Sequence, residues 1–195
     1  ILSSQIKTSS KTQTVVFSGC ASALVLAVSP FLGGISFQGI DKLWLITIIM
    51  ITSQAIGSVL YFKGIEVLDS STSQIAFSSF LIWGTFLSTV FLGSRFNIQQ
   101  ILGILILLFA ILLVNYRQQV SKMNSGVLYV ITAAGLFAIS QVTSAELSKT
   151  MSAGGYLILA YLGSTLIIGT RYFRLVQKEL PFLKKIFSTK TGKAS

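Results

Sequence analysis

The sequence predicts an all-α integral membrane protein with six transmembrane helices. Of its 195 residues, 52% are hydrophobic and only 10% are charged, whereas soluble domains carry about 25% charged residues. Six charge-free runs of 20 to 29 residues separate the short charged segments. Because a helix needs about 20 apolar residues to cross a hydrocarbon core of about 30 Å, each run is long enough to span a membrane.

A soluble bundle and a membrane β-barrel both fit these runs less well. A chain of this length could not bury six apolar helices on all sides. Barrel strands alternate polar and apolar residues over about 10 positions, but the segment 103–114, GILILLFAILLV, is apolar throughout. We therefore expect helices in contact with lipid, in a multi-pass protein of the cell membrane.

The expected helices follow the charge-free runs, and the short loops between them make neighbours antiparallel. The first helix is expected to end or kink near Pro30, because proline removes a backbone hydrogen bond. Asn97 is positioned to cap the fourth helix. The basic segment after residue 173 has too few consecutive apolar residues to span. The expected helices cover residues 14–36, 43–62, 73–92, 98–115, 126–146 and 154–172.

Lys63, Glu66 and Asp69 fall within seven positions between two apolar runs. A charge at the centre of a membrane helix costs roughly 2.5–3.5 kcal/mol, so we expect these residues in a turn at the membrane surface. The hydroxyl residues at 70–73 have two interpretations. Most such hydroxyls in membrane helices bond back to the preceding turn, whereas others line a polar pathway.

The composition excludes most enzyme chemistry. The sequence has no histidine and one cysteine, Cys20, so a zinc, haem or iron–sulfur site lacks a ligand set. A catalytic triad that depends on histidine is excluded on the same count. No acidic pair lies inside the apolar runs to provide acid–base catalysis. We expect no enzyme activity, no catalytic residue, no metal and no cofactor.

The net charge of +10 does not indicate a nucleic-acid partner. Seven of the fifteen basic residues lie after position 170, where they would flank a membrane helix. Basic segments in that position bind anionic lipid headgroups. The expected partners are therefore the lipid bilayer and a small-molecule substrate, with a homodimer left open.

The segment 57–114 resembles the EamA domain of the drug/metabolite transporter superfamily. The resemblance rests on an aromatic residue and a small-aliphatic pair, then a serine-rich turn, a glycine-led helix end and a glycine before the last aliphatic run. These positions are Tyr61, Gly64 and Ile65, Ser70 to Ser73, Gly93 and Ser94, and Gly103. Phe80 and Leu81 stand where the family often has Glu-Pro, and Ser94 stands at its helix-ending Glu, so no role of those acids is carried over.

The resemblance implies a ten-helix fold of two inverted five-helix repeats. Residues 1–117 would be the first repeat without its first helix, 118–173 the start of the second, and 174–195 a basic loop or tail. The segment KTSS at 7–10 is echoed by KTMS at 149–152, each just before an apolar run. On this scheme the chain is partial, and we expect these residues alone to show no saturable transport.

The resemblance also implies a secondary transporter that moves an amino acid, another metabolite or a drug-like compound by alternating access. A non-transporting membrane scaffold and an inactive transporter fragment are the alternatives. Transporters of this build bind substrate near the bilayer midplane, so polar residues deep in the runs are candidates for the substrate pathway. These candidates are Gln54, Ser58, Tyr61, Trp83, Ser140 and Gln141.

Gln54 and Gln141 are the strongest of these candidates. An amide in hydrocarbon needs a hydrogen-bond partner or water, which a substrate cavity supplies and an interhelical pair supplies equally well. Trp83 is interpreted first as a packing residue. Glu146 is expected to pair with Lys149 at the interface; if it faces the cavity, it could carry a coupling proton.

The charge distribution and the family topology predict opposite orientations in the membrane. With six spans, the side of the termini carries twelve Lys and Arg and the other side three, so the positive-inside rule places the termini in the cytoplasm. The family topology instead places 117–122 outside. We expect Ser125→Cys and Ser188→Cys, in a Cys20→Ser background, to be protected from an impermeant thiol reagent on intact cells. Labelling at both would favour the family topology.

Overall fold

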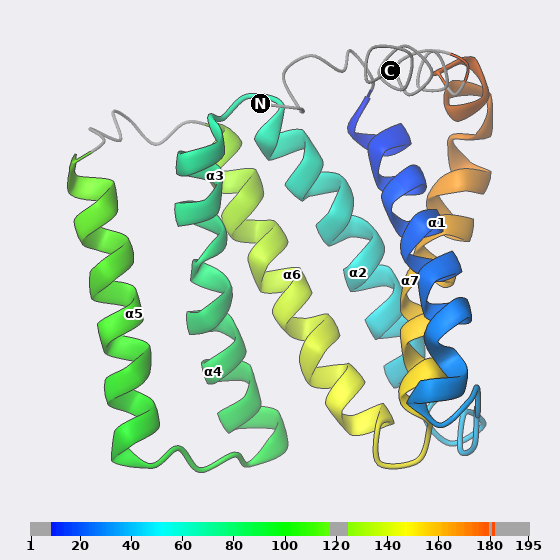
Figure 1. Cartoon of the computed structure of the whole chain (residues 1–195), viewed down its shortest axis with the longest axis horizontal. Coiled ribbons are helices and arrows are strands. Elements are labelled where there is room, and N and C mark those ends of the chain that lie inside the picture. The colour runs from blue at the N-terminus through cyan, green and yellow to red at the C-terminus, as the bar shows by residue number, and fades with distance from the viewer. Residues whose placement is uncertain (1–8, 118–124, 180, 182–195) are drawn as a thin grey trace, which may run out of the picture.

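The computed structural model describes residues 9–117, 125–179 and 181, and these contain helices and turns but no strand. Helices joined by the loops 33–43, 93–97 and 148–152 run antiparallel (Figure 1). The predicted all-helical class is therefore confirmed. The elements are α1 (Ser10–Val28), the 3-10 turn η2 (Ser29–Leu32), α2 (Trp44–Ile65), α3 (Ser70–Phe77), α4 (Ser79–Leu92), α5 (Ile98–Arg117), α6 (Ser125–Leu147) and α7 (Ala153–Arg171).

Five helical segments among the described residues are long and apolar enough to cross a membrane. Each of them overlaps one expected helix. The remaining expected helix, 98–115, corresponds to α5, which is 20 residues long. Its crossing stays a prediction, and the count of six is not established. The five segments are Ser10–Phe31, Trp44–Ile65, Ser70–Leu92, Ser125–Leu147 and Ala153–Arg171.

The first helix ends earlier than expected. α1 stops at Val28, and Pro30 lies at the start of η2, where its missing N–H breaks no helical hydrogen bond. Gly33 then adopts a left-handed φ of 81° that ends the turn at little steric cost. The expected end at residue 36 is wrong, because residues 33–43 form a loop without regular helix.

The third expected helix, 73–92, is interrupted at Ser78 and forms α3 and α4. Ser78 Oγ donates to the carbonyl of Gln74 at 2.9 Å, and Ser79 Oγ donates to the carbonyl of Ala76 at 2.8 Å. Hydroxyl bonds of this kind bend helices. The interruption is one residue long and involves no proline.

Side-chain caps fix the two helix starts that flank this segment. The carboxylate of Asp69 accepts the backbone N–H of Thr72 at 2.9 Å and its hydroxyl at 2.6 Å, and these hydrogen bonds lower the pKa of Asp69. Asn97 Oδ1 accepts the N–H of Gln100 at 2.8 Å, and Gln100 Oε1 accepts the N–H of Asn97 at 2.9 Å. The predicted Asn97 cap is confirmed as a reciprocal capping box.

Two of the three charges at 63–69 lie in the expected turn. Glu66 and Asp69 lie between α2 and α3, but Lys63 lies in the last helical turn of α2. Its Nζ is 4.2 Å from the ring centroid of Tyr129, an attractive cation–π distance. A long side chain can reach the interface from within a helix, which explains how α2 can continue past the charged Lys63 to Ile65.

The pair α2 and α6 forms the most extensive helix contact, with α1 on α7 and α4 on α6 beside it. Small residues allow the backbones to approach: a Cβ on Gly57 would lie 3.3 Å from Leu136, and one on Gly64 would lie 2.4 Å from Val130. This is how membrane helices pack without a hydrophobic driving force. α5 stands at the edge of the bundle, away from α6 and α7 (Figure 1).

The start of α1, the α2–α3 turn, the start of α6 and the end of α7 lie together at one end of the bundle (Figure 1). The segment after α7 begins as a helix over 173–179, which corrects the expectation of a loop or tail at its start. Glu179 of this segment returns to α1, where its Oε2 accepts the N–H of Ser9 at 2.9 Å and its hydroxyl at 3.0 Å.

The carboxylates of Glu66 and Glu179 both lie near the start of α1, and their pKa values shift in opposite directions. Burial alone would raise the pKa of Glu179, but hydrogen bonds from Thr12 and Ser9 lower it below its ordinary value. Partial burial raises the pKa of Glu66, and the nearby Glu179 charge adds to that effect against Ser10 and Lys63. Charged Glu179 thus stabilises the fold, whereas charged Glu66 opposes it.

We expect Glu179→Gln to lower the midpoint of thermal unfolding at pH 7 and Glu66→Gln to raise it. A group whose pKa is lowered in the folded protein stabilises the fold at a pH above its unfolded-state pKa. This stabilisation is lost as the pH falls through its folded-state pKa. The Glu179 effect is roughly 0.5–1 kcal/mol, reduced by solvent screening. In unfolding scans of the detergent-solubilised protein, the Glu66 difference should be lost as the pH falls from its raised folded pKa to the ordinary value. The Glu179 difference should be lost only at lower pH, as the pH falls through its lowered folded pKa. Effects of equal sign at pH 7 would contradict this assignment.

Candidate functional site

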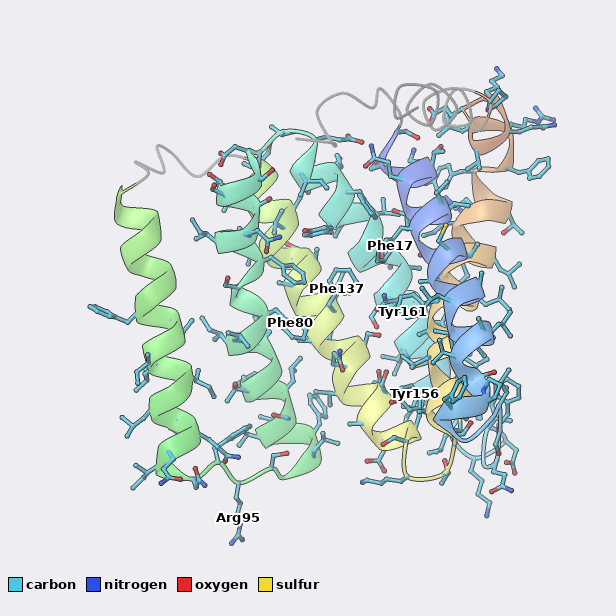
Figure 2. The ribbon with its side chains drawn as sticks, in the orientation of Figure 1. Phe17, Phe80, Arg95, Phe137, Tyr156 and Tyr161 are labelled. Atoms are coloured by element: carbon cyan, nitrogen blue, oxygen red, sulfur yellow. The ribbon has the colours of Figure 1, made fainter. Side chains whose placement is uncertain are left out.

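A cavity of about 770 Å³ lies among α1, α2, α3, α4, α6 and α7. Figure 2 shows labelled rings from four of these helices along the middle of the bundle, whereas Arg95 points away from one end. The lining residues are Phe17, Gln54, Ser58, Tyr61, Phe62, Phe77, Phe80, Phe137, Ser140, Gln141, Ser144, Tyr156, Leu157, Ala160 and Tyr161.

Five of the six residues predicted for the substrate pathway line this one cavity. Gln54, Ser58 and Tyr61 come from α2, where their spacing of four and three residues places them on one face. Ser140 and Gln141 come from the facing helix α6. The structure therefore brings together polar residues that lie more than 75 positions apart in the sequence.

Trp83 and Glu146 lie elsewhere. Trp83 of α4 is 41% exposed and its indole lies against α6 beside Gly135, so it packs between helices outside this cavity. Glu146 lines a second cavity of about 610 Å³ and forms an ion pair with Lys149 at the end of α6. The expected pairing of these two charges is present in the structure.

Aromatic rings make up most of the wall, and of these the sequence singled out only Tyr61. Eight of the fifteen lining residues are aromatic, compared with 11% of the chain. Phe77 is the centre of the cluster: its ring centroid lies 5.1 Å from Tyr61 and 5.8 Å from Phe137, both edge to face, and 5.9 Å from Phe80 in a stacked pair. Such distances are typical of attractive ring pairs.

Two of the serine hydroxyls in the lining form hydrogen bonds to the backbone of their own helices. Ser58 Oγ donates to the carbonyl of Gln54 at 2.8 Å, and Ser144 Oγ donates to the carbonyl of Ser140 at 2.7 Å. These bonds follow the expected back-bonding of hydroxyls.

The remaining polar groups of the cavity are uncommitted. Within the described part of the chain, the amides of Gln54 and Gln141 have no hydrogen-bond partner, and neither do the hydroxyls of Tyr61, Tyr156 and Tyr161. Each amide offers two donors and one acceptor, and each phenol offers one donor. The cavity therefore has free hydrogen-bonding capacity on two opposite walls, α2 and α6.

The described lining contains no charged residue, and the described residues contain no group of three His, Cys, Asp or Glu that could hold a metal ion. Nucleophilic or acid–base catalysis needs an activated or titratable group near neutral pH, and neither the amides nor the rings provide one. What the lining can do is bind a molecule by stacking and by neutral hydrogen bonds.

Helices of membrane-crossing length around such a cavity are typical of a membrane transport protein. The EamA-like transporter family matches residues 1–116, more than half of the chain. The chain belongs to the EamA-like transporter family, which is a family of transporters and not of enzymes, and it is a multi-pass membrane protein. Comparison with curated proteins and with solved structures gave no match.

Proposed function

We propose that the protein is a secondary transporter of the cell membrane that moves a small metabolite by alternating access through the cavity between α2 and α6. The observation that carries this proposal is the convergence of uncommitted polar groups in one cavity within the bundle. Gln54, Tyr61 and Gln141 are the residues we expect to contact substrate directly. An amide without a partner costs free energy in hydrocarbon, so the place of half-buried Gln54 and exposed Gln141 on a cavity wall favours contact with water or a ligand.

The arrangement of α1 and α7 supports an inverted repeat. The two helices pack together and run antiparallel (Figure 1). Ser9 caps the start of α1 and Ser152 caps the start of α7, at opposite ends of the bundle. The echoed segments 7–10 and 149–152 thus precede helices of opposite direction, as two inverted repeats require. We propose on this basis the division into a first repeat over 1–117 and a second repeat from 118, within a ten-helix carrier.

The proposed pathway is narrower than the set predicted from the sequence. It contains Gln54, Ser58, Tyr61, Ser140 and Gln141, with Trp83 outside it as a packing residue. A coupling role for Glu146 would have to operate from the second cavity, where its carboxylate is paired with Lys149.

Flux measurements on the full-length protein in proteoliposomes test the proposed function. The vesicles are preloaded with one metabolite at a time and given a trace of the same labelled compound outside. A transporter accelerates this exchange, and the rate saturates with concentration. Tight binding with exchange no faster than in empty vesicles, across the panel, would support the scaffold alternative.

A further inference from the structure

We propose that this cavity selects uncharged, planar heteroaromatic molecules over carboxylates and organic cations of the same shape. The inference rests on the proposed function, because it names the substrate class of the same cavity. It is carried by the combination of an aromatic wall, uncommitted neutral amides and the lack of charge in the described lining.

The aromatic wall favours a flat ligand. Phe77, Phe80 and Phe137 form a stacked and edge-to-face cluster, and Tyr161 of α7 lines the cavity as well. A planar ring beside such a cluster gains stacking that depends little on which atoms the ring contains. An aliphatic metabolite of equal size has no such gain.

The two amides favour a ring with polar edges. Gln54 on α2 and Gln141 on α6 line the cavity, and each amide presents donors and an acceptor side by side. The edge of a nitrogen heterocycle carries the same alternation, and a glutamine amide can bond to it in a bidentate manner. A plain hydrocarbon ring would leave both amides unpaired, and an unpaired buried group costs more than a typical hydrogen bond contributes.

The lack of charge disfavours ions of either sign. A carboxylate would find no Lys or Arg in the described lining, and a cation would find no Asp or Glu. Burying an unpaired ion costs far more than burying a hydrogen-bonded neutral group. Rings alone can hold a cation, but the described lining supplies no carboxylate to neutralise its charge.

Three planar probes of similar shape and different charge test the selection. Nicotinamide is uncharged, nicotinate is an anion and 1-methylnicotinamide is a cation at neutral pH. We expect the full-length protein in detergent to bind nicotinamide at least tenfold more tightly than either ion in equilibrium dialysis. Equal or tighter binding of either ion would overturn the inference, and so would the lack of measurable binding of all three.

Matched variants locate the binding. Gln54→Leu and Gln141→Leu are each expected to weaken nicotinamide binding about fivefold, whereas Gln74→Leu, an exposed glutamine of α3 outside the cavity, should bind as the wild type does. Unchanged binding in both cavity variants would overturn the inference.

The outcomes separate the substrate class from transport itself. Exchange of a carboxylate metabolite in proteoliposomes without nicotinamide binding keeps the proposed function and overturns the selectivity. Selective nicotinamide binding without exchange of any metabolite supports the ligand class and overturns the proposed function.

Discussion

The double variant Gln54→Leu and Gln141→Leu is expected to reduce transport by the full-length protein at least tenfold, with its abundance in the membrane within about twofold of wild type. Each substitution removes hydrogen bonds to substrate, and two neutral hydrogen bonds of about 1 kcal/mol each exceed the 1.4 kcal/mol that corresponds to tenfold. Leucine is favourable in a lipid-facing helix, and neither amide has a partner among the described residues, so the fold should not suffer.

The measurement is the initial rate of exchange in proteoliposomes, normalised to the amount of reconstituted protein. Gln74→Leu is the matched control, because it makes the same chemical change on α3 outside the cavity. Normal transport by the double variant at normal abundance would show that the two amides are packing residues and that substrate passes elsewhere.

The polar half of the cavity could be predicted from the sequence, because depth in an apolar run is a signal in itself. A polar side chain near the middle of a membrane helix needs a reason, and Gln54 and Gln141 both have that depth. Spacing on α2 then added Ser58 and Tyr61 to the same face. What the sequence could not decide was whether the two helices face each other, since that depends on the packing of α2 on α6.

The aromatic half could not be predicted for a physical reason. Phenylalanine and tyrosine are common in membrane helices on lipid-facing and packed surfaces alike, so Phe17, Phe80 and Tyr161 carry no signal of their own. They meet only because α1, α4 and α7 surround the α2–α6 pair. Only the assembled fold identifies these rings as one wall.

The helix interruption at Ser78 shows that the prediction of secondary structure from the sequence has the same limit. A proline predicts a helix end from the sequence, and α1 does end close to Pro30, at Val28. The expected end at residue 36 was too late. Serine hydroxyls bond back along most membrane helices without dividing them. The hydroxyls of Ser78 and Ser79 form the same kind of bond beside the interruption between α3 and α4. The local sequence therefore does not predict where the helix is interrupted.

The loop 33–43 is held on the start of α7 by one serine. Ser152 Oγ accepts the N–H of Ser36 at 2.9 Å and the N–H of Gly155 at 3.1 Å, and it donates to the carbonyl of Gly34 at 2.9 Å. The loop backbone lies so close that a Cβ on Gly155 would be 2.2 Å from the carbonyl oxygen of Ser36. Only glycine leaves room for this contact.

Gly155→Ala is therefore expected to destabilise the protein by about 1–3 kcal/mol, the range for overpacking that forces backbone to move, and to lower its yield in detergent. Gly169→Ala, on the same helix with nothing within 4 Å of the added Cβ, is the control and should be neutral or slightly stabilising because alanine favours helix. Thermal unfolding of the two purified variants compares them directly. Equal midpoints would mean that the loop does not rest on α7, because the added methyl group would then meet no backbone atom.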